Sequence, residues 1–288
     1  MHGAAREQPI RMNAGLEHFA QVVSREQFDL AEASLMLAQD IYPDLEIPNY
    51  IERLDGIAAA IRQRIAGDAF AEQKVRALNY YLFNEMRFSG NVEDYYDPRN
   101  SYLNEVLERR TGIPITLSIL YLEVGKRLGL NLKGISFPGH FLVKLSVKRG
   151  QLVLDPFIGG EAQSESDLRE RLAQVLPSGK AKQAQLDPYL EPATPRQIIA
   201  RLLRNLKNIY TQTGKLERAL AVMHRMLLVL PESAEELRDR GLVYQQLECF
   251  RPALSDLQNY LRRRPEAPDA AEIHSRIVEL KEATARLN

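Results

Sequence analysis

The sequence has one cysteine, no tryptophan and no excess of charge of either sign. Its 288 residues include 38 basic and 38 acidic side chains, and the single cysteine is Cys249. One cysteine excludes an intrachain disulfide and a metal site built on cysteine. A formal net charge of zero, with no long run of one sign, gives no general attraction to nucleic acid or to an anionic membrane. Long apolar runs are also missing, since no stretch approaches the roughly 18 uncharged residues of a membrane-spanning helix.

The remaining composition, 45% hydrophobic and 26% charged residues, is that of an ordinary soluble globular protein. The length is enough for two domains with well-buried cores. Residues 1–13 lack the apolar core of a secretory signal, and we expect them to be frayed. The five histidines show no metal-ligand spacing. We therefore expect a cytoplasmic protein without a metal or another cofactor.

Helical periodicity dominates the first half of the chain. Helices are predicted after a capping-box candidate at Ser24 and Gln27, from about residue 48, and over about 72–86, 102–110 and 114–128. The last is apolar on most of its circumference, so we expect it at the centre of its domain. Pro114 suits its first turn, where no backbone donor is needed. Asn100 or Ser101 can cap the short helix before it, and Gly112 fits the C-terminal end of that short helix.

After Gly129 the apolar period changes from helical to alternating, which indicates β-structure. A short strand is predicted around Ile135 and Phe137, followed by a hairpin of 140–147 with 151–155. Any hairpin loop of even length puts His140 and Asp155 on the same face of the sheet. A two-residue turn at 149–150 sets Asp155 opposite Lys144, whereas a four-residue loop at 146–149 sets it opposite His140.

The last third of the chain contains an internal repeat. A period of about 34 residues, that of tetratricopeptide repeats, relates one set of positions to a second set. Leu206, Tyr210, Ala219, Met223 and Pro231 correspond to Arg240, Tyr244, Ala253, Leu257 and Pro265. The proline-containing polar stretch 186–195 is the natural boundary, so we expect domains at 14–190 and 196–288. Because two repeats are few for a free-standing array, we expect the repeats to pack on the N-terminal domain.

Several long motifs resemble a known family. They are Gly90-Asn91 with the loop 93–103, Gly112-Ile113-Pro114-Ile115 with Ser118, Phe137-Pro138-Gly139-His140 and Asp155-Pro156-Phe157. Over nearly its whole length the chain resembles the bacterial SirB-type proteins, described as a transglutaminase-like domain followed by tetratricopeptide repeats. The resemblance implies a predominantly helical α+β fold. A transglutaminase-like, or papain-like, domain of helices and an antiparallel sheet then precedes the helical array.

The resemblance also implies a Cys-His-Asp site whose cysteine is missing here. Active enzymes of this kind place a thiolate at a helix N-terminus, where the helix dipole and a histidine lower the pKa of the thiol. Counting back from Gly129 to the cysteine position lands on Pro114, while His140 and Asp155 match the other two positions. We interpret the chain as a pseudoenzyme that binds a protein or peptide. On a purely structural interpretation, His140 and Asp155 form a hydrogen-bonded pair that holds the sheet against the helix.

An enzyme of another kind is the alternative. Thr116 and Ser118 are candidate substitute nucleophiles on the same helix. A hydroxyl needs a well-placed base, because its own pKa leaves it protonated. The alternative hypothesis is an unconventional hydrolase or amide-transfer enzyme that uses His140 and Asp155 with Ser118 or water.

Two further segments are candidate binding surfaces. Asp94, Asp97, Arg99 and Asn100 lie in a loop that is typical of a turn with a helix cap, and that can border a ligand site beside His140. Basic and polar residues at helical spacing, namely Arg201, Arg204, Asn205 and Asn208, form a stripe in a candidate peptide groove of the repeats. The alternative for this stripe is a solvated helix face. The partner and the oligomeric state stay open.

Overall fold

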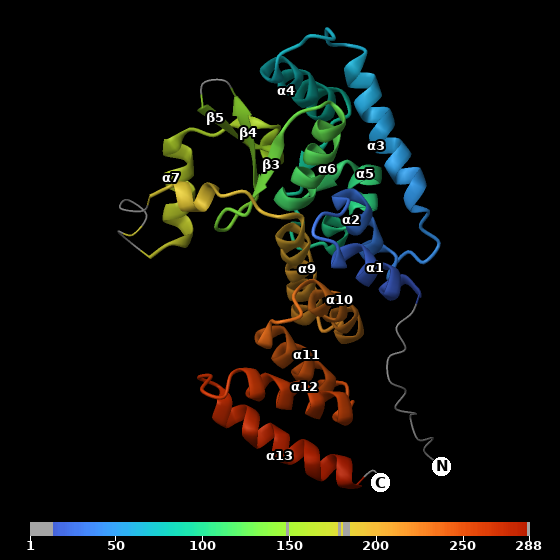
Figure 1. Ribbon diagram of the computed structural model, residues 1–288, viewed down its shortest axis with the longest axis vertical. Helices are drawn as coiled ribbons and strands as arrows, with labels where there is room; N and C mark the ends of the chain where they lie inside the picture. Colours follow the sequence, from blue (N-terminus) through green and yellow to red (C-terminus); the bar gives the residue numbers. More distant parts are fainter. Residues whose placement is uncertain (1–13, 148–149, 178–179, 181–184, 287–288) are drawn as a thin grey trace. The chain divides into compact units, whose positions relative to one another are not determined.

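The computed structural model describes residues 14–147, 150–177, 180 and 185–286, and it is predominantly helical with a small antiparallel sheet, as the sequence predicted (Figure 1). The chain divides into two compact units. One runs from Glu26 to Leu202. The other combines α1 (Ala14–Ser24) with the residues from Leu203 onward. The domain boundaries expected from the sequence, 14–190 and 196–288, and the packing of one domain on the other stay predictions.

The first unit begins with helices that surround one buried helix. They are α2 (Leu30–Ala38), α3 (Ile47–Arg62), α4 (Ala71–Asn79) with a π-helical continuation (Tyr80–Glu85), and α5 (Leu103–Arg109). The capping box expected at Ser24 is wrong. Ser24 ends α1, and α2 is capped by Asp29, whose side chain accepts a 2.9 Å hydrogen bond from the Glu32 backbone N–H.

The buried helix is α6 (Pro114–Arg127), and every residue from Pro114 to Gly125 is buried. This confirms the central helix and its first-turn proline. The short helix before it lies close to the expected range of about 102–110, but its expected caps are wrong. Tyr102 precedes α5, while Asn100 and Ser101 belong to a 3-10 turn (Pro98–Ser101). The chain leaves α5 through Arg110 in the left-handed conformation, with φ 57°, and Gly112 lies in β2 (Thr111–Gly112), paired in parallel with β1 (Ser89–Gly90).

The sheet lies between α6 and α7 (Glu165–Val175) (Figure 1). Its antiparallel order is β3 (Leu132–Ile135), β4 (Leu142–Val147), β5 (Gly150–Asp155) and β6 (Glu161–Ala162). α6 packs against β3 and β4. The opposite side of the sheet and α7 share a core that contains Ile135, Phe137, Leu142, Val153, Leu168, Leu172 and Leu190.

The hairpin register differs from both predicted alternatives. Val147 pairs with Gly150 and Val143 pairs with Leu154, so Asp155 lies opposite Leu142. The expected even loop is present, but its two residues, 148–149, lie outside the described part of the chain. His140 precedes β4, in the turn where its backbone N–H donates a 3.1 Å hydrogen bond to the Phe137 carbonyl.

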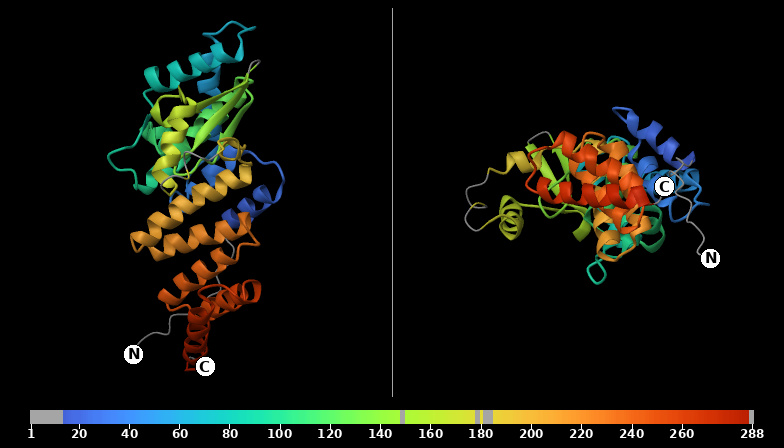
Figure 2. Two further views of the ribbon diagram at one scale, coloured as in Figure 1. Left: turned by 90° about the vertical axis from the view of Figure 1, so that its left-hand side faces the viewer. Right: turned by 90° about the horizontal axis from the view of Figure 1, so that it is seen from below.

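The second unit is built from consecutive helices (Figure 2). α9 (Pro195–Gln212) contributes its residues from Leu203 onward, followed by α10 (Leu216–Val229), α11 (Ala234–Gln246), α12 (Phe250–Arg263) and α13 (Ala270–Arg286). Ala219 and Ala253, the small residues at equivalent repeat positions, are fully buried. The sequence did not predict that α1 packs against α10.

Candidate functional site

His140 and Asp155 form a direct side-chain pair. His140 Nε2 lies 3.0 Å from Oδ1 and 2.9 Å from Oδ2 of Asp155. The Asp155 carboxylate is fully buried, whereas the His140 side chain keeps 11% of its surface exposed. The residue pair therefore lies at the edge of the domain interior, with the imidazole on the solvent side.

Asp155 accepts further hydrogen bonds from two other segments. The Phe157 backbone N–H donates to Oδ1 at 3.0 Å, and Arg171 Nη2 lies 2.6 Å from Oδ2. Arg171 comes from α7, on the side of the helix next to the buried Leu168 and Leu172. The sequence analysis did not single out Arg171. The signal for it is a basic residue next to the apolar face of an amphipathic helix. The carboxylate thus joins β5, α7 and the turn before β4.

The candidate nucleophile positions on α6 are all buried. Pro114 occupies the first helical position. Thr116 Oγ1 donates a 2.7 Å hydrogen bond to the Asn100 carbonyl and accepts one of 3.1 Å from the Ile113 backbone N–H. Ser118 is fully buried, and its Oγ has no hydrogen-bond partner in the described chain. Neither hydroxyl forms a hydrogen bond with His140.

The loop before α5 is held by two buried polar side chains. Asp97 accepts from the Arg99 backbone N–H at 2.9 Å and pairs with the Arg99 and Arg109 guanidinium groups. Burial raises the pKa of Asp97, but the hydrogen bonds from Arg99 and the two positive charges outweigh it and hold the pKa below its ordinary value. The expectation of a turn with a cap describes Asp97 well, although the capped element is the 3-10 turn.

Asn100 is fully buried and fixes the outer part of the same loop. Its Nδ2 donates to the carbonyls of Asp94 and Tyr95, at 2.7 and 3.3 Å, and its Oδ1 accepts from Asn91 at 3.1 Å. The Asp94 side chain is exposed. Among the four candidate binding residues of this loop, Asp97 and Asn100 are buried, and Asp94 and Arg99 face solvent.

An aromatic cluster connects this loop with His140. The Phe157 ring meets His140 edge-on, with 5.9 Å between ring centres, and meets Tyr95 at 6.3 Å. Tyr95 in turn contacts Tyr96 at 5.3 Å. Gly90 allows this arrangement, because a side chain at that position would collide with the Phe157 ring.

Four exposed apolar side chains lie on the segments that border this cluster. Tyr95, Tyr96, Ile158 and Val175 are four of the eight large apolar residues that are exposed among those described. Ile158 follows Phe157, and Val175 lies against Gly139, where an added Cβ would approach it to 2.8 Å. We call these four residues the apolar rim. Single exposed apolar residues are normal on a protein surface, whereas these four lie on segments that flank His140 and Asp155.

Arg201 belongs to this part of the molecule. Its Nη1 donates to Ser136 Oγ at 2.7 Å and to the Phe137 carbonyl at 2.9 Å, and its guanidinium lies 5.6 Å from the centre of the Phe141 ring. The turn that carries His140 is therefore fastened to α9. The predicted stripe is divided, since Arg201 belongs to the first unit and the other three residues to the second. Arg204 and Asn208 are exposed, and Asn205 is half-buried.

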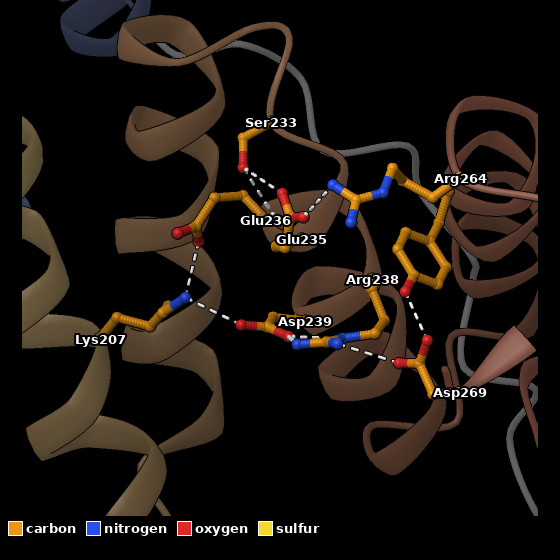
Figure 3. A network of polar contacts seen from close by, with 9 residues as sticks. Lys207, Ser233, Glu235, Glu236, Arg238, Asp239, Arg264 and Asp269 are labelled. Carbon is orange, nitrogen blue, oxygen red and sulfur yellow. Dashed lines mark hydrogen bonds and ion pairs between the residues drawn. The ribbon is translucent and has the colours of Figure 1, made fainter. Parts of the chain in front are cut away.

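The second unit contains a charged network that starts on α9 at Lys207, a residue that the sequence did not single out (Figure 3). Lys207 is buried, and its Nζ lies 2.7 Å from Glu236 and 2.9 Å from Asp239. Arg238 joins Asp239 to Asp269, at 2.8 and 2.9 Å. The hydrogen bond from Tyr260, followed by that from Arg238, holds the pKa of Asp269 below its ordinary value. These contacts link α9, α11 and α12 of the repeat region.

No three His, Cys, Asp or Glu side chains in the described ranges lie close enough together to hold a metal ion. None of the helices that the structure describes combines the length and apolar character needed to cross a membrane.

Comparisons with known proteins match both parts of the chain. A family model described as the transglutaminase-like superfamily matches residues 48–204, and a tetratricopeptide-repeat model matches residues 206–278. These matches confirm the expected architecture, while the SirB-type name stays an interpretation.

Curated relatives cover nearly the whole chain. A UPF0162 protein of Xylella fastidiosa (strain Temecula1 / ATCC 700964) is 41% identical over 258 residues, which is 90% of this chain and 92% of that protein. A UPF0162 protein of Vibrio cholerae is 33% identical, over 86% of this chain and 92% of that protein. The UPF0162 protein YchA of Escherichia coli (strain K12) is 27% identical, over 86% and 91%. A crystal structure of menin, described as revealing the binding site for Mixed Lineage Leukemia (MLL) protein, aligns with a TM-score of 0.39 and 12% identity, covering 84% of this chain and 68% of menin.

Proposed function

Because the chain belongs to the UPF0162 family, with a transglutaminase-like domain followed by tetratricopeptide repeats, we propose that it is a non-catalytic protein-interaction or regulatory protein. In this proposal the transglutaminase-like site has lost its nucleophile and binds a segment of a partner polypeptide. Tetratricopeptide repeats are protein-binding modules in general, and the match over residues 206–278 supports the same class of function.

The surroundings of His140 support a loss of catalysis. Covalent catalysis needs a nucleophile that is open to substrate and within hydrogen-bond reach of its base. Pro114 carries no nucleophilic group, the Thr116 hydroxyl is used by the backbone of the loop and the helix start, and the Ser118 hydroxyl is sealed inside the domain. The ion pair with Arg171 gives Asp155 a structural role that does not depend on catalysis.

The single observation that carries the binding proposal is the apolar rim around His140. Tyr95, Tyr96, Ile158 and Val175 expose apolar surface next to an imidazole that can accept or donate a hydrogen bond. Tyrosine is enriched in protein interfaces because it combines a large apolar ring with a polar hydroxyl. An extended partner segment with apolar side chains would cover the rim and leave its backbone within reach of His140.

Site-specific photocross-linking tests this proposal in cells that naturally produce the protein. A photoreactive phenylalanine replaces Tyr96 in one strain and Phe70 in another, since both side chains are large and exposed, at 72% and 63%. We expect a discrete cross-linked protein from position 96 that is absent from position 70 and is lost when Ile158→Ser is added. Equal products from both positions, or none from position 96, would overturn the proposal.

The alternative is an unconventional hydrolase or amide-transfer enzyme in which His140 and Asp155 act with Ser118 or a water. The partly exposed His140 ring is the observation in its favour. Profiling of purified protein on ester, amide and peptide substrates distinguishes the two functions. Turnover that is abolished by His140→Ala or Ser118→Ala, with the fold intact by circular dichroism, would establish the enzyme and remove the pseudoenzyme.

A further inference from the structure

Exposed acidic side chains lie on two of the segments that carry the apolar rim. Glu93 and Asp94 directly precede the rim residues Tyr95 and Tyr96, and Glu161 lies in β6, a few residues after the rim residue of the preceding turn. All three acidic side chains are exposed, and within the described ranges they form no ion pair. We call these three residues the rim carboxylates.

The strand register places one of the rim carboxylates beside the histidine–aspartate pair. Glu161 lies directly opposite Asp155 in the pairing of β5 with β6. Residues opposite each other in an antiparallel pair point to the same face of the sheet, with Cβ atoms about 4.5–5.5 Å apart. Because the Asp155 carboxylate contacts His140 Nε2 at 2.9 Å, the exposed Glu161 side chain begins next to that contact.

The other two rim carboxylates lie on a backbone that is fixed by hydrogen bonds. The Asp94 backbone N–H donates to Asn91 Oδ1 at 3.0 Å, and the Asp94 carbonyl accepts from the buried Asn100 Nδ2 at 2.7 Å. From this loop the aromatic cluster leads to His140. A backbone that is already ordered lowers the entropy cost of binding, so these carboxylates are presented to a partner at little further cost.

No positive charge on the same segments balances the rim carboxylates. Residues 88–98 and 156–168 contain no lysine or arginine. The arginines that approach from neighbouring elements already have acidic partners, namely Arg99 with Asp97 and Arg171 with Asp155. The exposed apolar surface beside His140 is therefore accompanied by uncompensated negative charge.

This combination of charge and apolar surface discriminates between classes of partner. Negative charge repels nucleic acids, anionic membranes and acidic polypeptides, whereas it attracts a segment that carries lysine or arginine. The exposed ring of Tyr96 adds a face on which an ammonium or guanidinium group binds favourably. The apolar rim and the rim carboxylates thus favour the same kind of occupant.

We propose that the partner segment bound at the apolar rim is basic as well as apolar, with lysine or arginine on either side of a short apolar stretch. This proposal rests on the proposed function, because it assigns the charge of the segment that the rim binds. The apolar side chains of the segment cover Ile158 and Tyr96. Its cationic side chains pair with Glu161 at one end and with Asp94 at the other.

Selection from a random library of twelve-residue peptides, displayed on phage, tests this proposal on the full chain. Peptides that bind the wild type but not Ile158→Ser are sequenced, synthesised and titrated. We expect them to contain more lysine and arginine than the starting library. In the triple variant Glu93→Gln, Asp94→Asn and Glu161→Gln the affinity should fall about tenfold, because three exposed ion pairs are lost.

A second triple variant is the matched control. Asp68→Asn, Glu266→Gln and Glu279→Gln remove the same number of exposed carboxylates on other segments, and should leave the affinity unchanged. Both triple variants change exposed side chains only, so both are expected to fold as the wild type does, which circular dichroism checks.

The outcomes separate this proposal from the proposed function. Selected peptides that require Ile158 but have no excess of basic residues, or that bind both triple variants equally well, would overturn the basic partner and leave the proposed function intact. The absence of any peptide that requires Ile158 would overturn both. Dimerisation of the wild type that Ile158→Ser abolishes, measured by sedimentation, would assign the rim to a second copy of the chain and would also overturn the basic partner.

Discussion

Arg171 forms a 2.6 Å ion pair with the same Asp155 carboxylate that His140 contacts. The carboxylate is therefore shared between a helix on one side of the sheet and the turn that precedes β4. A histidine–aspartate pair in this setting stabilises the domain whether or not the histidine takes part in a reaction.

Arg171→Met is expected to destabilise the first unit by about 2 kcal/mol, because a buried carboxylate loses one of its donors. The figure lies below that for a fully buried pair because the Arg171 side chain is 26% exposed. The measurement is hydrogen exchange of β4 and β5 amides. Arg169→Met removes an exposed pair on the same helix and should change stability by less than about 0.5 kcal/mol. Equal effects of the two substitutions would contradict a structural role for Asp155.

A thiol placed at the start of α6 should be unreactive. Pro114 is buried, so the cysteine of Pro114→Cys, in a Cys249→Ser background, would be shielded from reagents. We expect its reaction with a disulfide reagent at pH 8 to be at least about tenfold slower than that of the partly exposed Cys249 in the wild type. The opposite outcome is a fast modification that becomes slower when His140→Ala is added. It would indicate that Pro114→Cys alone restores a reactive thiolate beside His140.

The two hydroxyls of α6 should respond in opposite ways to removal. Thr116→Val breaks hydrogen bonds to the loop and to the helix start, and should cost about 1–2 kcal/mol. Ser118→Ala removes a buried hydroxyl without a partner, and should leave stability unchanged or raise it by up to about 1 kcal/mol. Denaturant unfolding of both variants checks this, and a large loss for Ser118→Ala would mean that its hydroxyl has a partner in solution.

The loop that carries the rim tyrosines should loosen in acid. The pKa of Asp97 is lower in the folded protein than in the unfolded chain, so its contribution to stability is present above the unfolded value of about 4. That contribution is lost as the pH falls through the folded value. We expect the difference in unfolding free energy between wild type and Asp97→Asn to be constant from about pH 6 to 8 and to shrink below about pH 4. A difference that persists at pH 2 would rule out the ionised carboxylate as its source.

Local patterns in the sequence predicted the parts of the fold that depend on periodicity. The apolar circumference of α6 and the first-turn proline predicted a buried central helix. The even hairpin loop was predicted correctly, but His140 lies in the turn before β4, so its contact with Asp155 does not follow from the alternation of side chains along a strand. The register did not follow, since it depends on which residues form the turn. Ser24 and Asp29 are both good caps, and the packing of the following helix decides in favour of Asp29.

Contacts between residues far apart in sequence could not be predicted. Asp155 contacts Arg171, and Phe137 contacts Arg201. The two members of each pair are too far apart along the chain for a local pattern to predict the contact. Helical spacing predicts one stripe of Arg201, Arg204, Asn205 and Asn208. Spacing along a helix does not predict which residues its successive turns contact. Here Arg201 contacts the turn before β4.

The exposed tyrosines of the rim depend on a residue that never reaches the surface. Asn100 is fully buried. Its side-chain Nδ2 donates to the Asp94 and Tyr95 backbone carbonyls, and its backbone carbonyl accepts from the Thr116 hydroxyl. A random-mutagenesis screen for lost partner binding would therefore return Asn100 and Thr116 together with Tyr96. Two of these three positions, Asn100 and Thr116, are buried, and only the exposed Tyr96 would mark where a partner contacts the protein.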